Sequence, residues 1–322
     1  MITRAPIRFD RSTGVLEEVN AWERFAVLLL IGGAKVSARF SHHGYRWGCN
    51  MLRWALPSRE VAMKLGPDAT FIFPYGDGYW SKMLDRSFRY EEELELLLRA
   101  ARDVDYTLID CGANFGFFSV LVSSPEFGSR PSIAIEPSSA NYELLTRSAA
   151  ANGNRFRTIR AAIGAERGTA RLSGFKHEGL SIVGESSAGG EEVPVIAVDN
   201  LVDDGIIAAD GKYVIKLDVE GVEIEALKGA ARLLTGDSIA VCEDHGSDRN
   251  HTVSRFILGE TALKLVVFDP VARRFERLTD VAPLDRIKNA RIGYNVFATA
   301  SPFWLDFIER LNASPALRAM RD

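Results

Sequence analysis

From Tyr90 onward the chain repeats one pattern, in which a short apolar run is followed by a segment with helical character. This repeat constrains the fold more than any other feature, because each connection between parallel strands must pass back over the sheet. It predicts an α/β fold with a seven-stranded, mostly parallel sheet and helices on both faces. The expected strands are 107–110, 132–136, 157–163, 213–218, 238–243, 263–268 and 292–298.

The first part of the chain has a different composition. It holds four of the five tryptophans and a turn-rich aromatic segment at 73–80. We therefore expect residues 1–89 to be an N-terminal extension and residues 90–322 to form the ligand-binding domain. We expect its aromatic cluster to pack in the core instead of stacking on a ligand. This cluster consists of Phe71, Phe73, Tyr75, Tyr79 and Trp80.

Charge and cysteine content limit the possible partners. The 322 residues include 39 basic and 43 acidic side chains, so no overall positive field favours nucleic acid, and we expect none as a partner. The three cysteines show no CxxC spacing, which fits a reducing compartment. The apolar run at 25–31 is too short to span a bilayer, and acidic residues precede it where a secretory signal would be basic. A cytoplasmic protein without a transmembrane segment is expected.

The first strand of the repeat ends in a glycine turn, Asp110-Cys111-Gly112-Ala113-Asn114-Phe115-Gly116. In a doubly wound sheet, ligands bind beyond the carboxyl ends of the strands, where the free N–H groups of the following helix can face them. The turn lacks the G-x-G-x-x-G spacing of a dinucleotide-binding loop, because Asn114 and Phe117 stand where that loop has glycine.

The second strand ends at Glu136, about twenty residues further on, where a carboxylate can accept hydrogen bonds from both ribose hydroxyls. Any strand–turn–helix unit can use glycine, and a glutamate can simply end a strand. The two features together are more specific. A ribose site beside a glycine turn without the spacing of a phosphate-binding loop indicates that the bound cofactor is S-adenosylmethionine.

Two blocks in the correct order resemble the FkbM family of S-adenosylmethionine-dependent methyltransferases. The first is 104–116 followed by Glu136-Pro137, Asn141 and Leu144-Leu145. The second, Lys216-Leu217-Asp218-Val219-Glu220-Gly221-Val222-Glu223, is similar to the family's K-x-D-x-E-G-x-E block and is followed by Leu227-Lys228-Gly229. Asp199-Asn200-Leu201 and Gly293-Tyr294-Asn295 resemble two further family elements. The resemblance covers about residues 90–298 and does not extend to the first 75 or so.

The resemblance implies a Rossmann-like class I methyltransferase fold and a set of cofactor contacts. Around the methionyl part of S-adenosyl-L-methionine it places Asp110, Gly112, Asn114 and Gly116. It places Glu136 on the ribose and Ala161 and Ala162 beside the adenine, and it gives Glu91 a place in the pocket.

Asp218 ends the fourth strand, so it is expected to face the transferred methyl group and to orient or deprotonate an acceptor hydroxyl. Lys216 lies two residues earlier on the same strand face, where its charge can hold Asp218 ionised. His245 follows the fifth strand at the same end of the sheet and is a further candidate base or substrate ligand. The other four histidines are expected to be solvated or to belong to the extension.

Glu220 and Glu223 open the next helix and are assigned to substrate binding, although the helix dipole favours carboxylates there whatever the function. Together with Asp218, Glu243 and Asp244 they offer oxygen ligands for magnesium. That site would require the helix start to turn its carboxylates inward, and we expect no metal. The Gly, Ser and Glu-rich segment 174–192 is predicted to be a mobile loop or a lid.

The leading hypothesis is an S-adenosylmethionine-dependent O-methyltransferase that acts on a hydroxyl of a saccharide, glycoconjugate or natural product. Two alternatives remain open. One is a scaffold that binds the same cofactor without catalysis, and the other is a nicotinamide oxidoreductase, since fold alone does not separate these functions.

Overall fold

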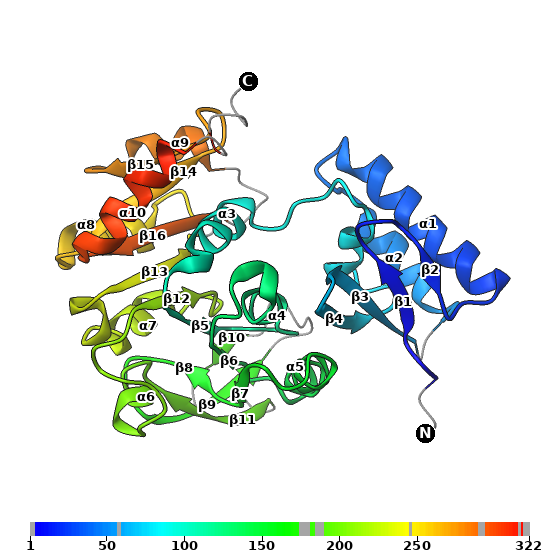
Figure 1. Cartoon of the computed structure of the whole chain (residues 1–322), viewed down its shortest axis with the longest axis horizontal. Coiled ribbons are helices and arrows are strands. Elements are labelled where there is room, and N and C mark those ends of the chain that lie inside the picture. Colours follow the sequence, from blue (N-terminus) through cyan, green and yellow to red (C-terminus); the bar gives the residue numbers. More distant parts are fainter. Residues whose placement is uncertain are drawn as a thin grey trace.

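The computed structural model describes residues 4–56, 59–173, 181–183, 190–244, 247–288, 294–314 and 317. Within them the chain forms one large sheet flanked by helices, a small second sheet, and an N-terminal sheet with two helices beside it (Figure 1).

The large sheet has eight strands in the described residues, in the order β15 (Arg274–Leu278), β14 (Lys264–Asp269), β16 (Asn295–Thr299), β13 (Ser238–Glu243), β12 (Tyr213–Leu217), β5 (Thr107–Cys111), β6 (Ser132–Ile135) and β7 (Arg157–Ile159). The five strands from β13 to β7 are parallel. β16, β14 and β15 join by antiparallel pairing. The α/β prediction is confirmed, with a mixed sheet. The expected count of seven strands is wrong because β15 adds an edge strand.

The third predicted strand, 157–163, divides between two sheets. Its first residues form β7, and its last two form β8 (Ala162–Ile163) in the small sheet. That sheet has the order β10 (Ser181–Val183), β9 (Gly168–Ser173), β11 (Glu191–Ile196) and β8. Of the predicted loop at 174–192, residues 174–180 and 184–189 lie outside the described part of the chain.

Alternate side chains of the large sheet enter two separate cores, as the period of two in a strand requires. Leu108 and Val214 belong to one core, whereas Ile109 and Ile215 belong to the other. The first core is covered by α3 (Glu92–Ala100), α4 (Phe117–Val122) and α10 (Pro302–Asn312). The second is covered by α6 (Asn200–Asp203), α7 (Glu223–Gly229), α8 (Thr252–Glu260) and α9 (Ala282–Ile287). Helices therefore cover both faces, as expected.

The N-terminal part forms its own sheet, in the order β2 (Leu16–Glu17), β1 (Ile7–Asp10), β3 (Glu60–Gly66) and β4 (Ala69–Pro74). Helices α1 (Ala21–Ala38) and α2 (Tyr45–Arg53) connect β2 to β3. Asn20 and Glu23 begin α1 with a reciprocal capping box.

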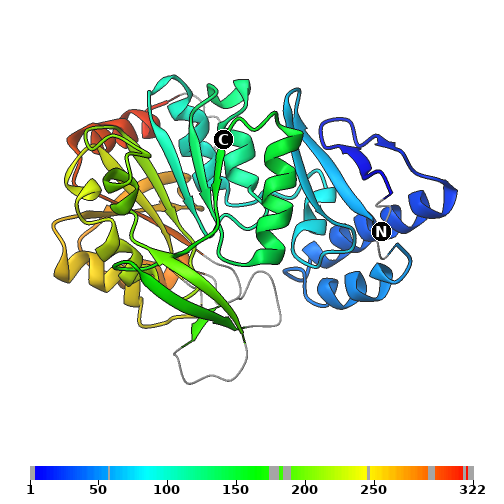
Figure 2. The same ribbon diagram turned by 90° about the horizontal axis from the view of Figure 1, so that it is seen from below.

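This N-terminal sheet packs along α5 (Ser139–Ala151), which follows β6 (Figure 2). The backbone N–H of Ile72 donates to Ser148 Oγ at 3.2 Å, and Asn152 exchanges two hydrogen bonds with the backbone of Thr70. The 3-10 helix Trp80–Leu84 follows β4, and its first residue, Trp80, donates from Nε1 to Asn114 Oδ1, beyond the carboxyl end of β5. Residues near 80 therefore reach the edge of the sheet where a ligand site is expected.

No helix in the described residues is long and apolar enough to cross a membrane. The apolar run at 25–31 lies within α1, where Ala26, Val27 and Leu30 are buried while Phe25, Leu28 and Leu29 are exposed.

Candidate active site

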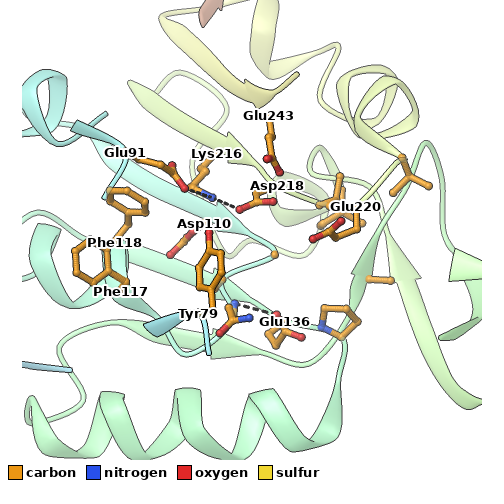
Figure 3. Close-up of a pocket in the computed structure, with 18 of the residues that line it drawn as sticks. Tyr79, Glu91, Asp110, Phe117, Phe118, Glu136, Lys216, Asp218, Glu220 and Glu243 are labelled. Atoms are coloured by element: carbon orange, nitrogen blue, oxygen red, sulfur yellow. Dashed lines mark hydrogen bonds and ion pairs between the residues drawn. The ribbon is translucent and has the colours of Figure 1, made fainter. Parts of the chain in front are cut away.

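A cavity of about 320 Å³ lies beyond the carboxyl ends of β5, β6, β12 and β13 (Figure 3). Parallel strands bring these ends together, so residues distant in sequence meet at one place. Acidic side chains dominate its charged lining. Among the described residues, this lining contains one cation, Lys216, against six carboxyl groups, those of Glu91, Asp110, Glu136, Asp218, Glu220 and Glu243.

Lys216 and Asp218 form a short ion pair at the end of β12. Lys216 Nζ donates to Asp218 Oδ2 at 2.7 Å, and the lysine side chain is 4% exposed. Burial alone would lower the pKa of Lys216, but the negative charges of Asp218, Glu91 and Asp110 raise it above its usual value. The lysine therefore remains protonated and stabilises the negative charge of Asp218.

Glu91 approaches the same lysine from the start of α3, with 3.9 Å between Glu91 Oε1 and Lys216 Nζ. Its other oxygen accepts a hydrogen bond of 3.0 Å from Asn295 Nδ2 on β16. Burial raises the pKa of Glu91 to about 7, although Lys216 acts in the opposite direction. The asparagine of the late G-Y-N element thus helps to hold Glu91 beside the ion pair.

Glu243 ends β13 and points towards Asp218 (Figure 3). Burial raises its pKa to about 10, and both the charge of Asp218 and a side-chain hydrogen bond with it act in the same direction. Glu243 therefore keeps its proton at neutral pH and shares it with Asp218. From the sequence, Glu243 was expected only as a candidate metal ligand, and its contact with Asp218 was not predicted.

The glycine turn at the end of β5 lies directly against β12. A Cβ atom on Gly112 would lie 1.8 Å from the backbone oxygen of Asp218, and its φ of +74° is in the left-handed region. Glycine is therefore required for this close approach of the two strand ends. Asp110, just before the turn, is buried and accepts a hydrogen bond of 2.7 Å from Ser119 Oγ on α4.

Glu136, which follows β6, is fixed by three donors. Its carboxylate accepts from the backbone N–H of Asn114 at 2.9 Å, from that of Ser138 at 3.0 Å and from Asn141 Nδ2 at 3.2 Å. Burial raises the pKa of Glu136 to about 8, and these hydrogen bonds oppose the shift. The carboxylate is thus rigidly oriented at the cavity wall.

Most of the predicted site residues line the cavity: Glu91, Asp110, Gly112, Asn114, Glu136, Ala161, Ala162, Lys216, Asp218 and Glu220. Burial raises the pKa of Glu220 to about 7.

Two predicted residues that the structure describes are not in the lining. Gly116 instead faces α5, where a Cβ atom would lie 2.6 Å from Leu145 Cδ1, so it permits helix packing. Glu223 is 3% exposed and accepts from the N–H of Gly221 at 2.9 Å, which fits stabilisation of the turn and does not fit a substrate contact. His245 lies outside the described residues.

The candidate magnesium ligands do not all face the cavity. Asp244 is fully buried and bonds Lys288 and Ser254 instead of facing the cavity. Among the described residues, no group of three or more His, Cys, Asp or Glu side chains has the arrangement of a metal site. His251, expected to be solvated, is 2% exposed and lies 3.2 Å from Asp285.

Aromatic residues form the wall that sequence reasoning missed. The aromatic residues among the added lining residues are Tyr79, Trp80, Tyr90, Phe117 and Phe118. Trp80 Nε1 donates to Asn114 Oδ1 at 3.0 Å, which ties the N-terminal part to the glycine turn. The aromatic cluster in the sequence was the available signal, but it divides: Phe71, Phe73 and Tyr75 are core residues, whereas Tyr79 and Trp80 reach the cavity.

Comparisons with known proteins define the class of this domain. Residues 110–263 match the family model described as a methyltransferase FkbM domain. The chain therefore contains a methyltransferase domain. Within that class, the match at residues 110–263 is to the FkbM model, in agreement with the resemblance of the two sequence blocks.

Individual relatives are distant. The chain is 27% identical over 197 residues to the hexuronic acid methyltransferase AglP of Haloferax volcanii, a match that covers 59% of this chain and 76% of that protein. The crystal structure of methyltransferase FkbM from Methylobacillus flagellatus matches at 17% identity and a TM-score of 0.38, over 60% of this chain and 43% of that one. A precorrin-6y C5,15-methyltransferase from Geobacter metallireducens matches at 12% identity and a TM-score of 0.37, over 66% of this chain and 90% of that one.

Proposed function

We propose that the chain is an S-adenosylmethionine-dependent O-methyltransferase that acts on a hydroxyl of a saccharide, a glycoconjugate or another natural product. The observation that carries the proposal is one cavity with two functional ends, the glycine turn with Glu136 and the Lys216–Asp218 ion pair. The relative named as a hexuronic acid methyltransferase supports a saccharide acceptor. We also propose a cytoplasmic location. The chain is proposed to divide into an N-terminal extension, residues 1–89, and a methyltransferase domain, residues 90–322, and the extension supplies Tyr79 and Trp80 to the cavity.

The charge of the cavity fits S-adenosylmethionine better than a nicotinamide dinucleotide. The ionised Asp218, the oxygens of the other carboxyl groups and several aromatic rings suit a sulfonium cation, because all of these groups present negative charge or partial negative charge. A pyrophosphate would face the same carboxyl groups with one lysine to compensate its charge. Glu136 would hold the ribose, the turn at 112–114 would adjoin the methionyl part, and Ala161 and Ala162 would flank the adenine.

When bound, the cofactor supplies a methyl group on a positively charged sulfur. The chain must then align an acceptor hydroxyl and receive its proton. Asp218 is proposed to accept that proton as the new oxygen–carbon bond forms. Lys216 keeps Asp218 ionised before transfer, and the protonated Glu243 orients the carboxylate through their hydrogen bond. Glu220, at the far side of the same pocket, is proposed to contact the acceptor.

Radiolabelled methyl transfer from S-adenosylmethionine to a panel of saccharides, with hexuronic acid-containing oligosaccharides among them, tests this proposal. Asp218→Asn should lower the transfer rate about a hundredfold or more while cofactor affinity changes little, since a general base contributes on that scale. Asp210→Asn is the matched control, because Asp210 is exposed and precedes the opposite end of β12. Equal rates for wild type and Asp218→Asn would remove Asp218 from the reaction.

The same assay separates catalysis from the scaffold alternative. A scaffold would bind the cofactor and transfer no methyl group to any acceptor of the panel. Transfer that depends on Asp218 excludes a purely structural role.

A further inference from the structure

Helix α1 is apolar on both of its faces, but the protein covers only one of them. Its inner face buries Ala26, Val27, Leu30 and Ala34. Its outer face exposes an apolar row at helical spacing: Trp22, Phe25, Leu28, Leu29 and Val36. A helix that is hydrophobic all round is normally buried, so an uncovered apolar face of this extent marks an interaction surface.

The neighbouring helix extends the apolar area. α2 packs against α1, where the hydroxyl of Tyr45 donates to the backbone oxygen of Leu30 at 3.2 Å. Its exposed residues include Trp47 and Trp54, which are 70% and 84% exposed, and Met51 lies between them in the sequence. Phe40 in the connection is exposed as well. We call the exposed residues of α1, of α2, of this connection and of the α2 C-cap, Trp54, the α1–α2 surface.

The charges on this surface have one sign. Residues 21–56, all of which the structure describes, contain five basic residues, Arg24, Lys35, Arg39, Arg46 and Arg53, and one acidic residue, Glu23. Glu23 is buried, caps α1 and pairs with Arg59, so it adds no negative charge to the outside. The chain as a whole has a formal net charge of −4, so this positive segment is a local feature.

We propose that the α1–α2 surface binds an anionic lipid bilayer, with α1 lying in the plane of the interface. Exposed Trp, Phe and Leu side chains beside Lys and Arg are the chemistry of helices that insert one face among lipid headgroups. A second copy of the chain fits less well, because a symmetric dimer would bring this cationic surface against itself. Bound in this way, the methyltransferase domain would work beside a membrane without crossing it.

Flotation with vesicles tests the proposal on the full chain. Wild-type protein should float with vesicles of phosphatidylcholine and phosphatidylglycerol, and bind vesicles of phosphatidylcholine alone more weakly. Phe25→Ser/Leu29→Ser should weaken binding by about tenfold or more through lost apolar burial. Val271→Ser is the matched control, because Val271 is 91% exposed but lies in the turn between β14 and β15.

The basic residues are tested separately, with variants that disturb no buried side chain. Lys35→Glu/Arg39→Glu should weaken binding to the anionic vesicles by about fivefold or more, since each basic residue near such a surface contributes on that scale. Added salt should weaken binding in wild type more than in this variant.

Tryptophan emission is an independent readout of the same surface. Three of the five tryptophans, Trp22, Trp47 and Trp54, belong to it, whereas Trp80 and Trp304 are buried. Anionic vesicles should therefore shift the emission to shorter wavelength. Equal flotation of wild type and Phe25→Ser/Leu29→Ser would overturn the proposal. A second result would also overturn it: the wild-type protein does not bind anionic vesicles, light scattering shows a dimer, and Phe25→Ser/Leu29→Ser dissociates that dimer. The α1–α2 surface would then bind a second copy of the chain.

Discussion

The ionisation of Glu136 should control affinity for the nucleoside part of the cofactor. We consider Glu136→Gln, which keeps the shape of the side chain and removes its charge. In the folded protein the pKa of Glu136 is raised to about 8 by burial. Ribose hydroxyls donate hydrogen bonds, and the ionised carboxylate accepts them more strongly than the neutral acid. Affinity should therefore rise with pH.

The size of the effect follows from that pKa. With a pKa of about 8, about a tenth of Glu136 is ionised at pH 7 and about nine tenths at pH 9. If the ionised form alone binds well, affinity rises about tenfold over this interval, or about 1.4 kcal/mol. Glu136→Gln should bind about 1–3 kcal/mol more weakly than wild type at pH 9 and lose the pH dependence.

Calorimetric titration with 5′-methylthioadenosine is the assay, because this ligand lacks the amino acid part whose own titration would complicate the result. Glu143→Gln, at an exposed position of α5, is the control and should behave as wild type. Glu91 and Glu220 also line the cavity and have pKa values of about 7. A pH dependence that persists unchanged in Glu136→Gln would assign it to such a group and refute the ribose assignment.

Three further predictions concern stability. Lys216→Met should lower the free energy of unfolding in urea by about 3–5 kcal/mol, because Asp218, Glu91 and Asp110 lose their buried cation; the exposed control Lys64→Met should cost less than about 1 kcal/mol, and equal losses would contradict the reasoning. The free energy of unfolding of Glu243→Gln should exceed that of wild type at pH 9, and this difference should become smaller or change sign at pH 5. The folded protein, with a Glu243 pKa of about 10, holds a proton that the unfolded chain releases above pH 4.5, so wild type loses stability as pH rises through this window; parallel pH profiles from chemical denaturation would refute the assignment. Gly112→Ala should cost about 3 kcal/mol or more in thermal denaturation, against about 1–2 kcal/mol for Gly153→Ala, which has positive φ but open space around its Cβ position; similar losses would show that the contact with Asp218 is relaxed without cost.

Local patterns predicted the elements that build the site. The apolar runs at 107–110, 132–136, 213–218 and 238–243 are the strands β5, β6, β12 and β13, because a strand buried on both faces is a continuous apolar run. β15 was missed because Arg274 and Arg277 interrupt its apolar residues, as is common on an edge strand.

The sequence did not predict which distant strands and side chains pair. β1 pairs in parallel with β3, about fifty residues away, so neither strand is specified by its neighbours in the chain. The same limit applies to the site: Glu243 meets Asp218 and Trp80 meets Asn114 only after the sheet and the N-terminal part are assembled. Glu223 shows a further limit of the motif, because its sequence position did not reveal that its carboxylate accepts a hydrogen bond from the turn at Gly221.

The central claim is that the cavity binds S-adenosylmethionine. Parallel calorimetric titrations of the purified chain with S-adenosylmethionine, S-adenosylhomocysteine and NADH test it most directly. We expect binding of the first two and none of NADH, since a pyrophosphate would enter a cavity whose described lining residues include six carboxyl groups and one lysine. Binding of NADH alone would contradict the assignment of the glycine turn and, with it, the proposed function.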